Sequence, residues 1–270
     1  MTRLQTCFTA LSATGDKALI PYITAGDPHK ETTVPLMHAM VAAGASIIEL
    51  GVPFSDPMAD GPVIQRAAER ALAHGTSLHD VLAMVAEFRR QDANTPVLLM
   101  GYLNPIEVMG YAAFAKAAAR AGVDGVITVD LPPEEAGDLL KEFAVHQVAP
   151  IFLIAPTTPV QRIQTICAQA NGFVYYVSMK GVTGAAHLDF TPVAEKVRTI
   201  RQFTDLPVGI GFGIKDAATA AKAAACADAV VVGSAIVQRV EEHRDDAAGI
   251  LTAVSDFLRT LTPVLKNSSN

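Results

Sequence analysis

Short apolar runs rich in β-branched residues alternate along the chain with longer, alanine-rich amphipathic stretches. This alternation is typical of a parallel β-sheet whose strands are connected by helices. Eight strand-and-helix units can be counted, which predicts an α/β protein with a (β/α)8 TIM-barrel fold and extra helices. The predicted strands are Leu19 to Thr24, Ser46 to Val52, Pro96 to Tyr102, Gly125 to Asp130, Pro150 to Ala155, Gly172 to Ser178, Pro207 to Gly211 and Ala229 to Gly233.

The predicted helices follow these strands, and several of them open with proline. Proline is tolerated in the first turn of a helix because its missing N–H would have no partner there. An additional helix is expected at Leu78 to Arg90. The other helices are expected to begin near Glu31, Pro62, Pro105, Pro133, Pro159, Thr191, Lys215 and Asp246.

The length and composition of the chain fit one barrel. The chain has 270 residues, half of them hydrophobic, and barrels of roughly 250 residues form a single domain. We therefore expect one barrel domain over residues 1–265. The remaining residues, 266–270, are polar and predict a disordered tail.

Charge and cysteine usage narrow the class of protein. A formal net charge of -6 argues against binding to nucleic acid, which requires clustered Lys and Arg. The three cysteines are widely spaced and form no C-x-x-C, so neither a disulfide framework nor a zinc site is indicated. The N-terminus lacks the apolar core of a signal peptide, and no membrane span is expected. These features predict a cytoplasmic protein.

Glu49 is a carboxylate inside the apolar second strand. Burial disfavours an ionised, unpaired Glu, so the side chain needs a reason to be there. One interpretation is a structural ion pair with a neighbouring Lys or Arg. The other is a general acid/base, because burial raises the pKa of a carboxyl group towards the pH at which the protein works.

The loop after this strand carries two aspartates, Asp56 and Asp60, among three prolines. Asp56, which precedes Pro57, is better explained as a turn residue than as a catalyst. Asp60 precedes Gly61 and fits either a turn or helix cap or a functional carboxylate. Spacing alone leaves both interpretations of Asp60 open.

The segment from Ile48 to Pro62 resembles the signature segment of tryptophan synthase α chains. The similarity includes Pro21 to Pro28 and continues through Gly181 to Ala185, Gly211 to Ile214 and Gly233 to Val237, so it covers nearly the whole chain. It implies a carbon-carbon lyase of tryptophan biosynthesis that cleaves indole-3-glycerol phosphate into indole and glyceraldehyde 3-phosphate by a retro-aldol reaction. It also implies a β-chain partner in an α2β2 heterotetramer, which joins indole to serine and carries pyridoxal phosphate. No cofactor or metal is expected in this chain.

The same resemblance implies roles for individual residues. Glu49 would be the acid/base and Asp60 the partner of the indole N–H. Thr183 would hydrogen-bond Asp60, and Tyr175 would approach Glu49, although Tyr175 can equally be an anchored core tyrosine. Apolar residues on the strands are candidate walls of an indole pocket, although such residues are more often plain core. The wall candidates are Tyr22, Met100, Ile127, Val129 and Leu153.

Two glycine-rich turns end the seventh and eighth strands. Barrels often bind phosphate there, because bare N–H groups and a helix N-terminus point at the ligand. The alternative is a pair of ordinary tight turns. By resemblance Gly184 would be a further contact. The phosphate candidates in the turns are Phe212, Gly213, Gly233 and Ser234.

Several rival interpretations remain open. Met179 to His187 fits a lid over the substrate or a plain mobile loop. Lys180, just past the sixth strand, would suit a Schiff-base aldolase, but its position is the only support. His74 and His79 lack the helical spacing of a metal pair. A sensor that binds a phosphate ligand without catalysis is disfavoured because both carboxylates are present. The β-chain contact is expected near Asp56, Pro57 and the helix after Asn104-Pro105.

Overall fold

The chain forms a parallel barrel surrounded by helices. The structure, a computed structural model, describes residues 1–177, 190–211 and 213–266. The strands described belong to one parallel sheet in the order β5-β4-β3-β2-β1-β9-β8-β7-β6. They are β1 (Ala18–Thr24), β2 (Ile48–Gly51), β3 (Val97–Gly101), β4 (Gly125–Thr128), β5 (Ala149–Pro150), β6 (Leu153–Ile154), β7 (Val174–Val177), β8 (Val208–Gly211) and β9 (Ala229–Val232).

The fifth strand of the barrel is interrupted and is divided into β5 and β6, which together close the barrel. β5 pairs with β4, and β6 pairs with β7. Between them, the N–H of Ile151 donates to the carbonyl of Val126 at 2.9 Å, and the carbonyl of Phe152 accepts from the N–H of Tyr175 at 3.1 Å. β5 and β6 are therefore two parts of one strand, which is hydrogen-bonded to β4 on one side and to β7 on the other. The predicted eight-stranded barrel is confirmed.

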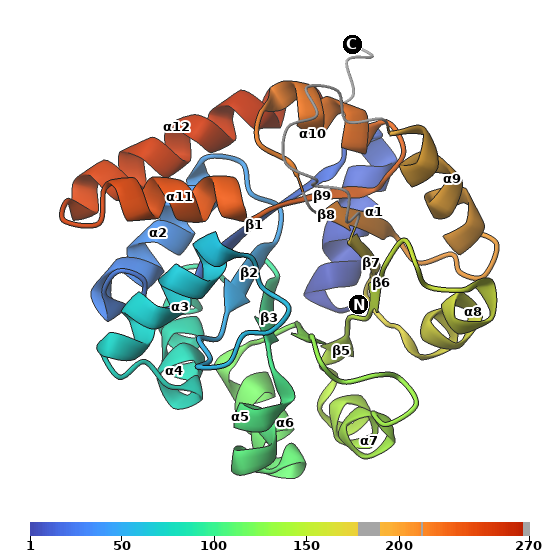
Figure 1. Cartoon of the computed structure of the whole chain (residues 1–270), viewed down its shortest axis with the longest axis horizontal. Coiled ribbons are helices and arrows are strands. Elements are labelled where there is room, and N and C mark those ends of the chain that lie inside the picture. Colours follow the sequence, from blue (N-terminus) through green and yellow to red (C-terminus); the bar gives the residue numbers. More distant parts are fainter. Residues whose placement is uncertain (178–189, 212, 267–270) are drawn as a thin grey trace.

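The helices lie around the barrel (Figure 1), and α1 lies within their ring. Most begin within two residues of the predicted starts. The helices are α1 (Arg3–Thr14), α2 (Lys30–Ala42), α3 (Pro62–Ala73), α4 (Leu78–Phe88), α5 (Leu103–Met109), α6 (Tyr111–Ala121), α7 (Gly137–His146), α8 (Val160–Gln169), α9 (Thr191–Ile200), α10 (Ala217–Ala224), α11 (Ser234–Glu242) and α12 (Ala247–Leu265).

Three helix boundaries differ from the prediction. The helix expected from Pro105 is two helices, because Gly110 adopts a φ of 84° that interrupts the α-helical backbone. The helix expected near Pro133 begins at Gly137. Residues 132–136 form a tighter turn instead, in which the N–H of Glu135 donates to the carbonyl of Pro132. α1 was not predicted, although the capping box between Thr2 and Gln5 marks its start.

α1 closes the amino end of the barrel. Its inward residues Leu4 and Phe8 join the cluster of side chains that fills the barrel interior. The rings of Phe8 and Phe173 lie 5.8 Å apart. The Arg89 guanidinium at this end donates to Asp124 at 2.7 Å, and the two side chains are 10% and 5% exposed. The amino end is therefore packed and closed, which leaves the carboxyl ends of the strands for function.

A second core lies between the strands and the surrounding helices. α12 is the one described helix long and apolar enough to cross a membrane. Its residues Ile250, Val254, Leu258 and Leu261 are fully buried in this core. The helix also packs against α2, α10 and α11. Burial in the core therefore accounts for its apolar composition.

Candidate active site

Glu49 lies inside the barrel, in the middle of β2. Its neighbours in register are Tyr22 on β1 and Leu98 on β3. The residue is 1% exposed, and its Oε2 atom has no hydrogen-bond partner among the described residues. Burial, followed by the charge of Asp60, raises the pKa of Glu49 to about 8. The carboxyl group is therefore mainly protonated at neutral pH, and no described residue forms the structural ion pair considered above.

Two tyrosines share the barrel interior with Glu49. The Tyr22 hydroxyl lies 3.2 Å from the hydroxyl of Thr24. Burial and then the charge of Glu49 raise the pKa of Tyr175, so its hydroxyl keeps its proton. A Cβ at Gly51 would overlap the Tyr22 hydroxyl, and one at Gly211 would overlap that of Tyr175. These glycines therefore leave the space that the two rings occupy.

Asp60 lies in the loop between β2 and α3 and is held by Tyr102. The Tyr102 hydroxyl donates to Oδ2 of Asp60 at 3.1 Å, and the N–H of Ala59 donates to the same hydroxyl at 3.0 Å. Phe54 stacks on the Tyr102 ring with centroids 5.1 Å apart. Burial raises the pKa of Asp60, and the hydrogen bond from Tyr102 opposes that shift. The loop and the end of β3 thus fix the carboxyl group together.

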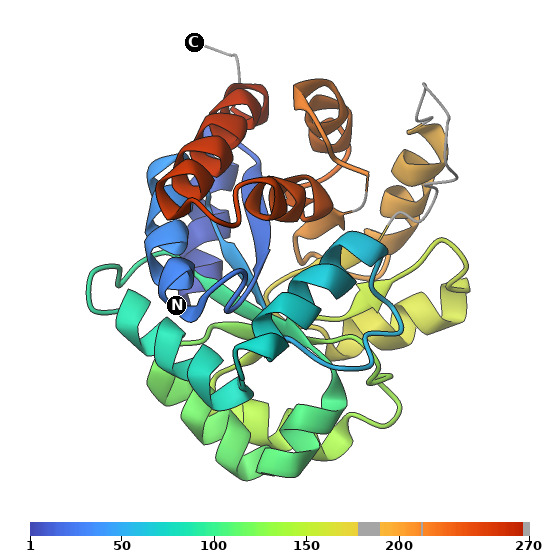
Figure 2. The ribbon, with the colours of Figure 1, turned by 60° about the vertical axis from the view of Figure 1, so that its left-hand side comes forward.

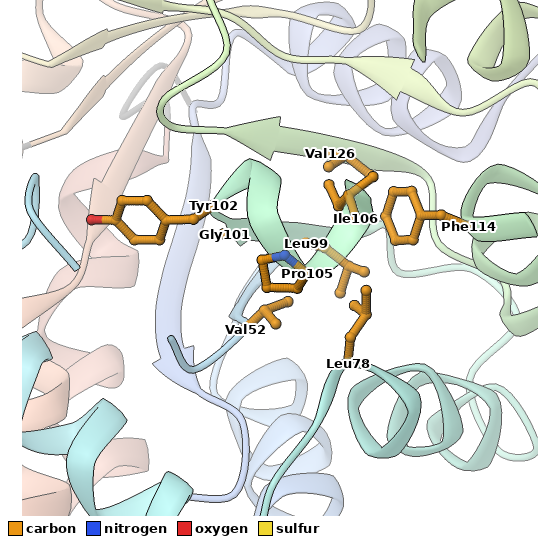
Figure 3. A pocket seen from close by; sticks show the side chains of 9 residues that line it. All are labelled: Val52, Leu78, Leu99, Gly101, Tyr102, Pro105, Ile106, Phe114 and Val126. Carbon is orange, nitrogen blue, oxygen red and sulfur yellow. The ribbon is translucent and has the colours of Figure 1, made fainter. Parts of the chain in front are cut away.

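Tyr102 was not singled out from the sequence. A signal was available, because it is a polar residue at the end of a predicted strand, where barrel sites are built. Figure 3 shows the Tyr102 ring turned away from a small apolar cavity. This cavity lies outside the barrel, between the strands and the helices α4, α5 and α6. That cavity is lined by residues such as Leu99, Ile106 and Phe114, and contains neither carboxylate. The cavity is therefore not the site.

The residues proposed as walls of the indole pocket lie in or beside two apolar side-chain clusters, and Met100 packs against both clusters. Ile127 and Tyr175 belong to the barrel-interior cluster, and Met100 packs against it together with Leu153. Met100 also packs against Tyr22. Val129 is half-buried after β4. The second cluster further contains Val63, Ile64 and Ala67 of α3, which the sequence did not indicate because a helix face does not show which strand it covers.

The proposed phosphate end lies beside β1. Gly213 has a φ of 75°, in the left-handed region that favours glycine, just after β8. Gly233 is the N-cap of α11, whose first residue is Ser234, and as a glycine it supplies no side-chain cap. A Cβ at Gly233 would meet Tyr22 at 3.7 Å, an ordinary contact. Packing among the described residues therefore does not require glycine at position 233.

Some predicted residues cannot be placed. Thr183, Gly184, Lys180 and Phe212 lie outside the described residues. Within the described ranges, no group of three or more His, Cys, Asp or Glu side chains could hold a metal ion. The ring of His74 contacts that of His29 in a tilted arrangement, with centroids 4.6 Å apart.

Comparisons with known proteins agree with this architecture. The family model for the tryptophan synthase alpha chain matches residues 8–265. The tryptophan synthase alpha chain of Thioalkalivibrio sulfidiphilus is 65% identical over 258 residues, which cover 96% of this chain and 97% of that one. The alpha chain of Nitrosococcus oceani is 59% identical, with 100% of both chains covered. The crystal structure of tryptophan synthase subunit alpha from Legionella pneumophila is similar with a TM-score of 0.92 and 45% identity, covering 98% of each chain.

The fold and the buried acid at its centre define a (β/α)8-barrel enzyme. The chain belongs to the tryptophan synthase alpha chain family. The family consists of lyases that cleave indole-3-glycerol phosphate into indole, for the β subunit, and glyceraldehyde 3-phosphate. The fold class and the reaction expected from the sequence are thereby confirmed.

The raised pKa of Glu49 predicts a pH-dependent stability. Between the ordinary pKa of 4.5 and about 8, folded Glu49 keeps a proton that the unfolded chain has released. The free energy of unfolding contributed by this group therefore falls as pH rises through that range. Glu49→Gln lacks this contribution, so its stability relative to wild type should increase by on the order of a few kcal/mol from low to high pH. Urea denaturation of both proteins across this range measures the difference, and a constant difference would contradict the raised pKa.

Proposed function

We propose that the chain performs this cleavage by general acid/base catalysis without a metal ion, with Glu49 as the acid/base and Asp60 as the partner of the indole N–H. The observation that carries the proposal is the buried carboxyl group of Glu49, whose Oε2 atom has no partner among the described residues and whose pKa is raised to about 8 by burial and by the charge of Asp60. A protonated acid can donate first and accept afterwards, so one residue can serve both proton transfers.

The reaction begins at C3 of the indole ring. Glu49 donates its proton to C3, which places positive charge on the ring nitrogen, and the Asp60 carboxylate stabilises that charge. The Glu49 carboxylate then accepts the proton of the hydroxyl group on the adjacent glycerol carbon. As the aldehyde forms there, the bond to C3 breaks and its electron pair returns to the ring. Glu49 is protonated again, and indole and glyceraldehyde 3-phosphate leave.

The surroundings of Glu49 suit an indole ring. Tyr22, Met100, Ile127 and Tyr175 would form the walls, and Tyr102 would orient Asp60. An apolar, water-poor pocket strengthens the charge interaction between Asp60 and the protonated ring. Asp60 is half-buried and would lie between this pocket and solvent.

The phosphate group would bind at the start of α11. Gly213, Gly233 and Ser234 would present N–H groups, and the helix dipole would favour the negative charge. The glycine at the N-cap of α11 supports this role, because Gly233 has no side-chain oxygen that would compete with a phosphate for the first N–H groups of the helix. Gly184 and Phe212 would complete the phosphate site, and Thr183 would hydrogen-bond Asp60.

The wider setting follows from the family. The chain would act as one catalytic domain, residues 1–265, in the cytoplasm, where its three free cysteines stay reduced. It would hold no cofactor itself. In an α2β2 heterotetramer, the β chain would carry pyridoxal phosphate and join the released indole to serine.

The β chain would dock beside the Asp60 loop. Met58 in this loop and Val108 on α5 are 83% and 82% exposed, which is unusual for large apolar side chains. The Ala59 N–H and the residue preceding α5, Tyr102, are joined by a hydrogen bond, so the loop and helix lie side by side. Together with Asp56 and Pro57, the apolar side chains of Met58 and Val108 would form the β-chain contact next to the indole pocket.

Substitutions of three carboxylates test which of them take part in catalysis. Glu49→Gln removes the transferable proton but keeps the shape, so turnover of indole-3-glycerol phosphate should fall on the order of a thousandfold while the protein folds. Asp60→Asn removes the charge and should lower kcat far more than it raises KM. Asp56→Asn is the control, since Asp56 is exposed and its carboxylate accepts only from the Ser55 hydroxyl among the described residues. Equal losses at positions 56 and 60 in the isolated chain would exclude Asp60 from the substrate site.

The second prediction tests the phosphate end through Gly233→Ala. The added methyl group should obstruct phosphate without disturbing the fold, so affinity for glyceraldehyde 3-phosphate should fall roughly tenfold or more, as expected for loss of a hydrogen bond to a charged group. Affinity for indole should change little. Calorimetry measures the first ligand. Fluorescence measures the second, because the chain contains no tryptophan.

Gly137→Ala is the matched control for this test, because Gly137 starts α7 and its Cβ would meet nothing within 4 Å. It should leave both affinities intact. Unchanged binding of glyceraldehyde 3-phosphate to Gly233→Ala would place the phosphate elsewhere.

The third prediction concerns the partner. Val108→Asp puts a charge on the proposed β-chain contact and should weaken association with the β chain roughly tenfold or more, as at an interface position that loses apolar burial. Turnover by the isolated chain should stay the same. Val145→Asp is the control, because Val145 is also exposed, at 73%, but lies on α7. Equal weakening by both substitutions, measured by analytical ultracentrifugation with the β chain, would exclude α5 from the interface.

A further inference from the structure

A network of four charged side chains connects two helices and a loop at the carboxyl end of the barrel. Arg70 on α3 donates to both oxygens of Asp27 at 2.7 and 2.9 Å and to Glu241 on α11 at 2.9 Å. Arg66, one turn earlier on α3, donates to both oxygens of Glu241 at 2.7 and 2.8 Å. Asp27 follows β1 and is 3% exposed. Arg70 thus bridges three separate parts of the chain.

The two helices carry opposite ends of the site. α3 begins at Pro62, two residues after Asp60, and α11 begins at Ser234. Figures 1 and 2 both show α3 beside α11. Beneath the charges, Ala67 of α3 and Val237 of α11 are buried against Tyr22. The ion network therefore lies over an apolar contact, which shields it from water on one side and strengthens it.

We infer that Arg70 is a positioning residue that fixes the span between the indole end and the phosphate end of the site. The inference rests on the proposed function, which places Asp60 at one end and the start of α11 at the other. A substrate with a fixed separation between its indole and phosphate groups gains from binding both ends only when the two subsites keep that separation. Separate indole and glyceraldehyde 3-phosphate do not have this requirement.

The guanidinium group suits this role better than any other side chain. Its five N–H donors lie in a rigid plane, so it can bind a carboxylate with two parallel hydrogen bonds and still reach a second carboxylate. The ammonium group of Lys is a point charge on a flexible stem and would not fix both partners in one geometry. Hydrogen bonds from Arg66, followed by the charges of Arg70 and Arg66, lower the pKa of Glu241 to about 2, so this carboxylate stays ionised.

A matched ion pair exists at the opposite end of the barrel. Arg89 donates to Asp124 at 2.7 Å, and their side chains are 10% and 5% exposed. The Arg70–Asp27 pair is comparably buried, at 18% and 2%. Asp124 also accepts from the N–H of Val97 at the start of β3, far along the strands from their carboxyl ends. Loss of Arg70 or Arg89 should lower stability, but Arg70 belongs to the network that connects the two ends of the site, whereas Arg89 lies at the opposite end of the barrel.

The experiment compares Arg70→Met with Arg89→Met in the full-length chain. For Arg70→Met we expect kcat/KM for indole-3-glycerol phosphate to fall roughly tenfold to a hundredfold, as for a misplaced binding group. Affinities for separate indole and glyceraldehyde 3-phosphate should each change less than about threefold, because each ligand occupies only one end. Arg89→Met should lower the urea midpoint while kcat/KM of the folded protein stays unchanged. Arg70→Lys should not restore kcat/KM.

Two outcomes would overturn the inference. One is a loss of affinity for a separate ligand as large as the loss for the whole substrate. The other is an Arg70→Met variant that loses stability but keeps kcat/KM, like Arg89→Met. If Arg70→Met does not fold, Glu241→Gln carries the test, because it weakens the α3–α11 link and leaves the Arg70–Asp27 pair. Failure of the proposed phosphate site would be seen separately, as unchanged glyceraldehyde 3-phosphate binding to Gly233→Ala.

Discussion

The constraint on which the site depends is the burial of the Glu49 carboxyl group inside the barrel. Transfer of a carboxylate from water into a protein interior raises its free energy, and no cation among the described residues pairs with Glu49 to offset this. The group responds by holding its proton, which is the state that a general acid needs. Other parts of the fold stabilise the barrel that holds this buried acid. One of them is the apolar cluster at the amino end, where Leu4 and Phe8 of α1 close the barrel. The amino end of the barrel thus contributes stability, whereas the carboxyl ends of the strands carry the site.

Strand register sets what lies around that carboxyl group. Side chains alternate between the interior and the helices, so Glu49 faces inward while Ile48 and Leu50 face the outer core. A shift of one residue would exchange them and place two aliphatic side chains inside. Gly51 and Gly211 are explained in the same way, because their missing side chains leave room for Tyr22 and Tyr175. Each of these pairs couples one strand to another.

The sequence predicts the strands well because most of their residues are buried on both faces of the sheet, so apolar runs mark them directly. It predicts Glu49 for the same reason, since a charge stands out in such a run. Helix starts are predicted less well: the prolines at 132 and 133 suit a helix start, but the backbone forms a tight turn before α7. The contacts of Arg70 could not be predicted, because its partners lie 43 and 171 residues away and charged residues on helices are usually solvated. Tyr102 lay at a strand end, but only the fold shows that it reaches Asp60.

The two ends of the proposed site come from distant parts of the chain, and two different ties bring them together. β1 pairs with β9, so that Pro21 lies beside Val232, one residue before Gly233. This hydrogen-bonded tie fixes the strands, but it ends where the loops begin. The charged tie through Arg70 and Glu241 starts beyond that point and holds the helices that the loops connect to. Pairing of strands alone would leave the Asp60 loop and the start of α11 free to shift relative to one another. In the proposed mechanism, bond cleavage requires C3 to lie at Glu49 while the phosphate is held, so the precision of the site would depend on both connections.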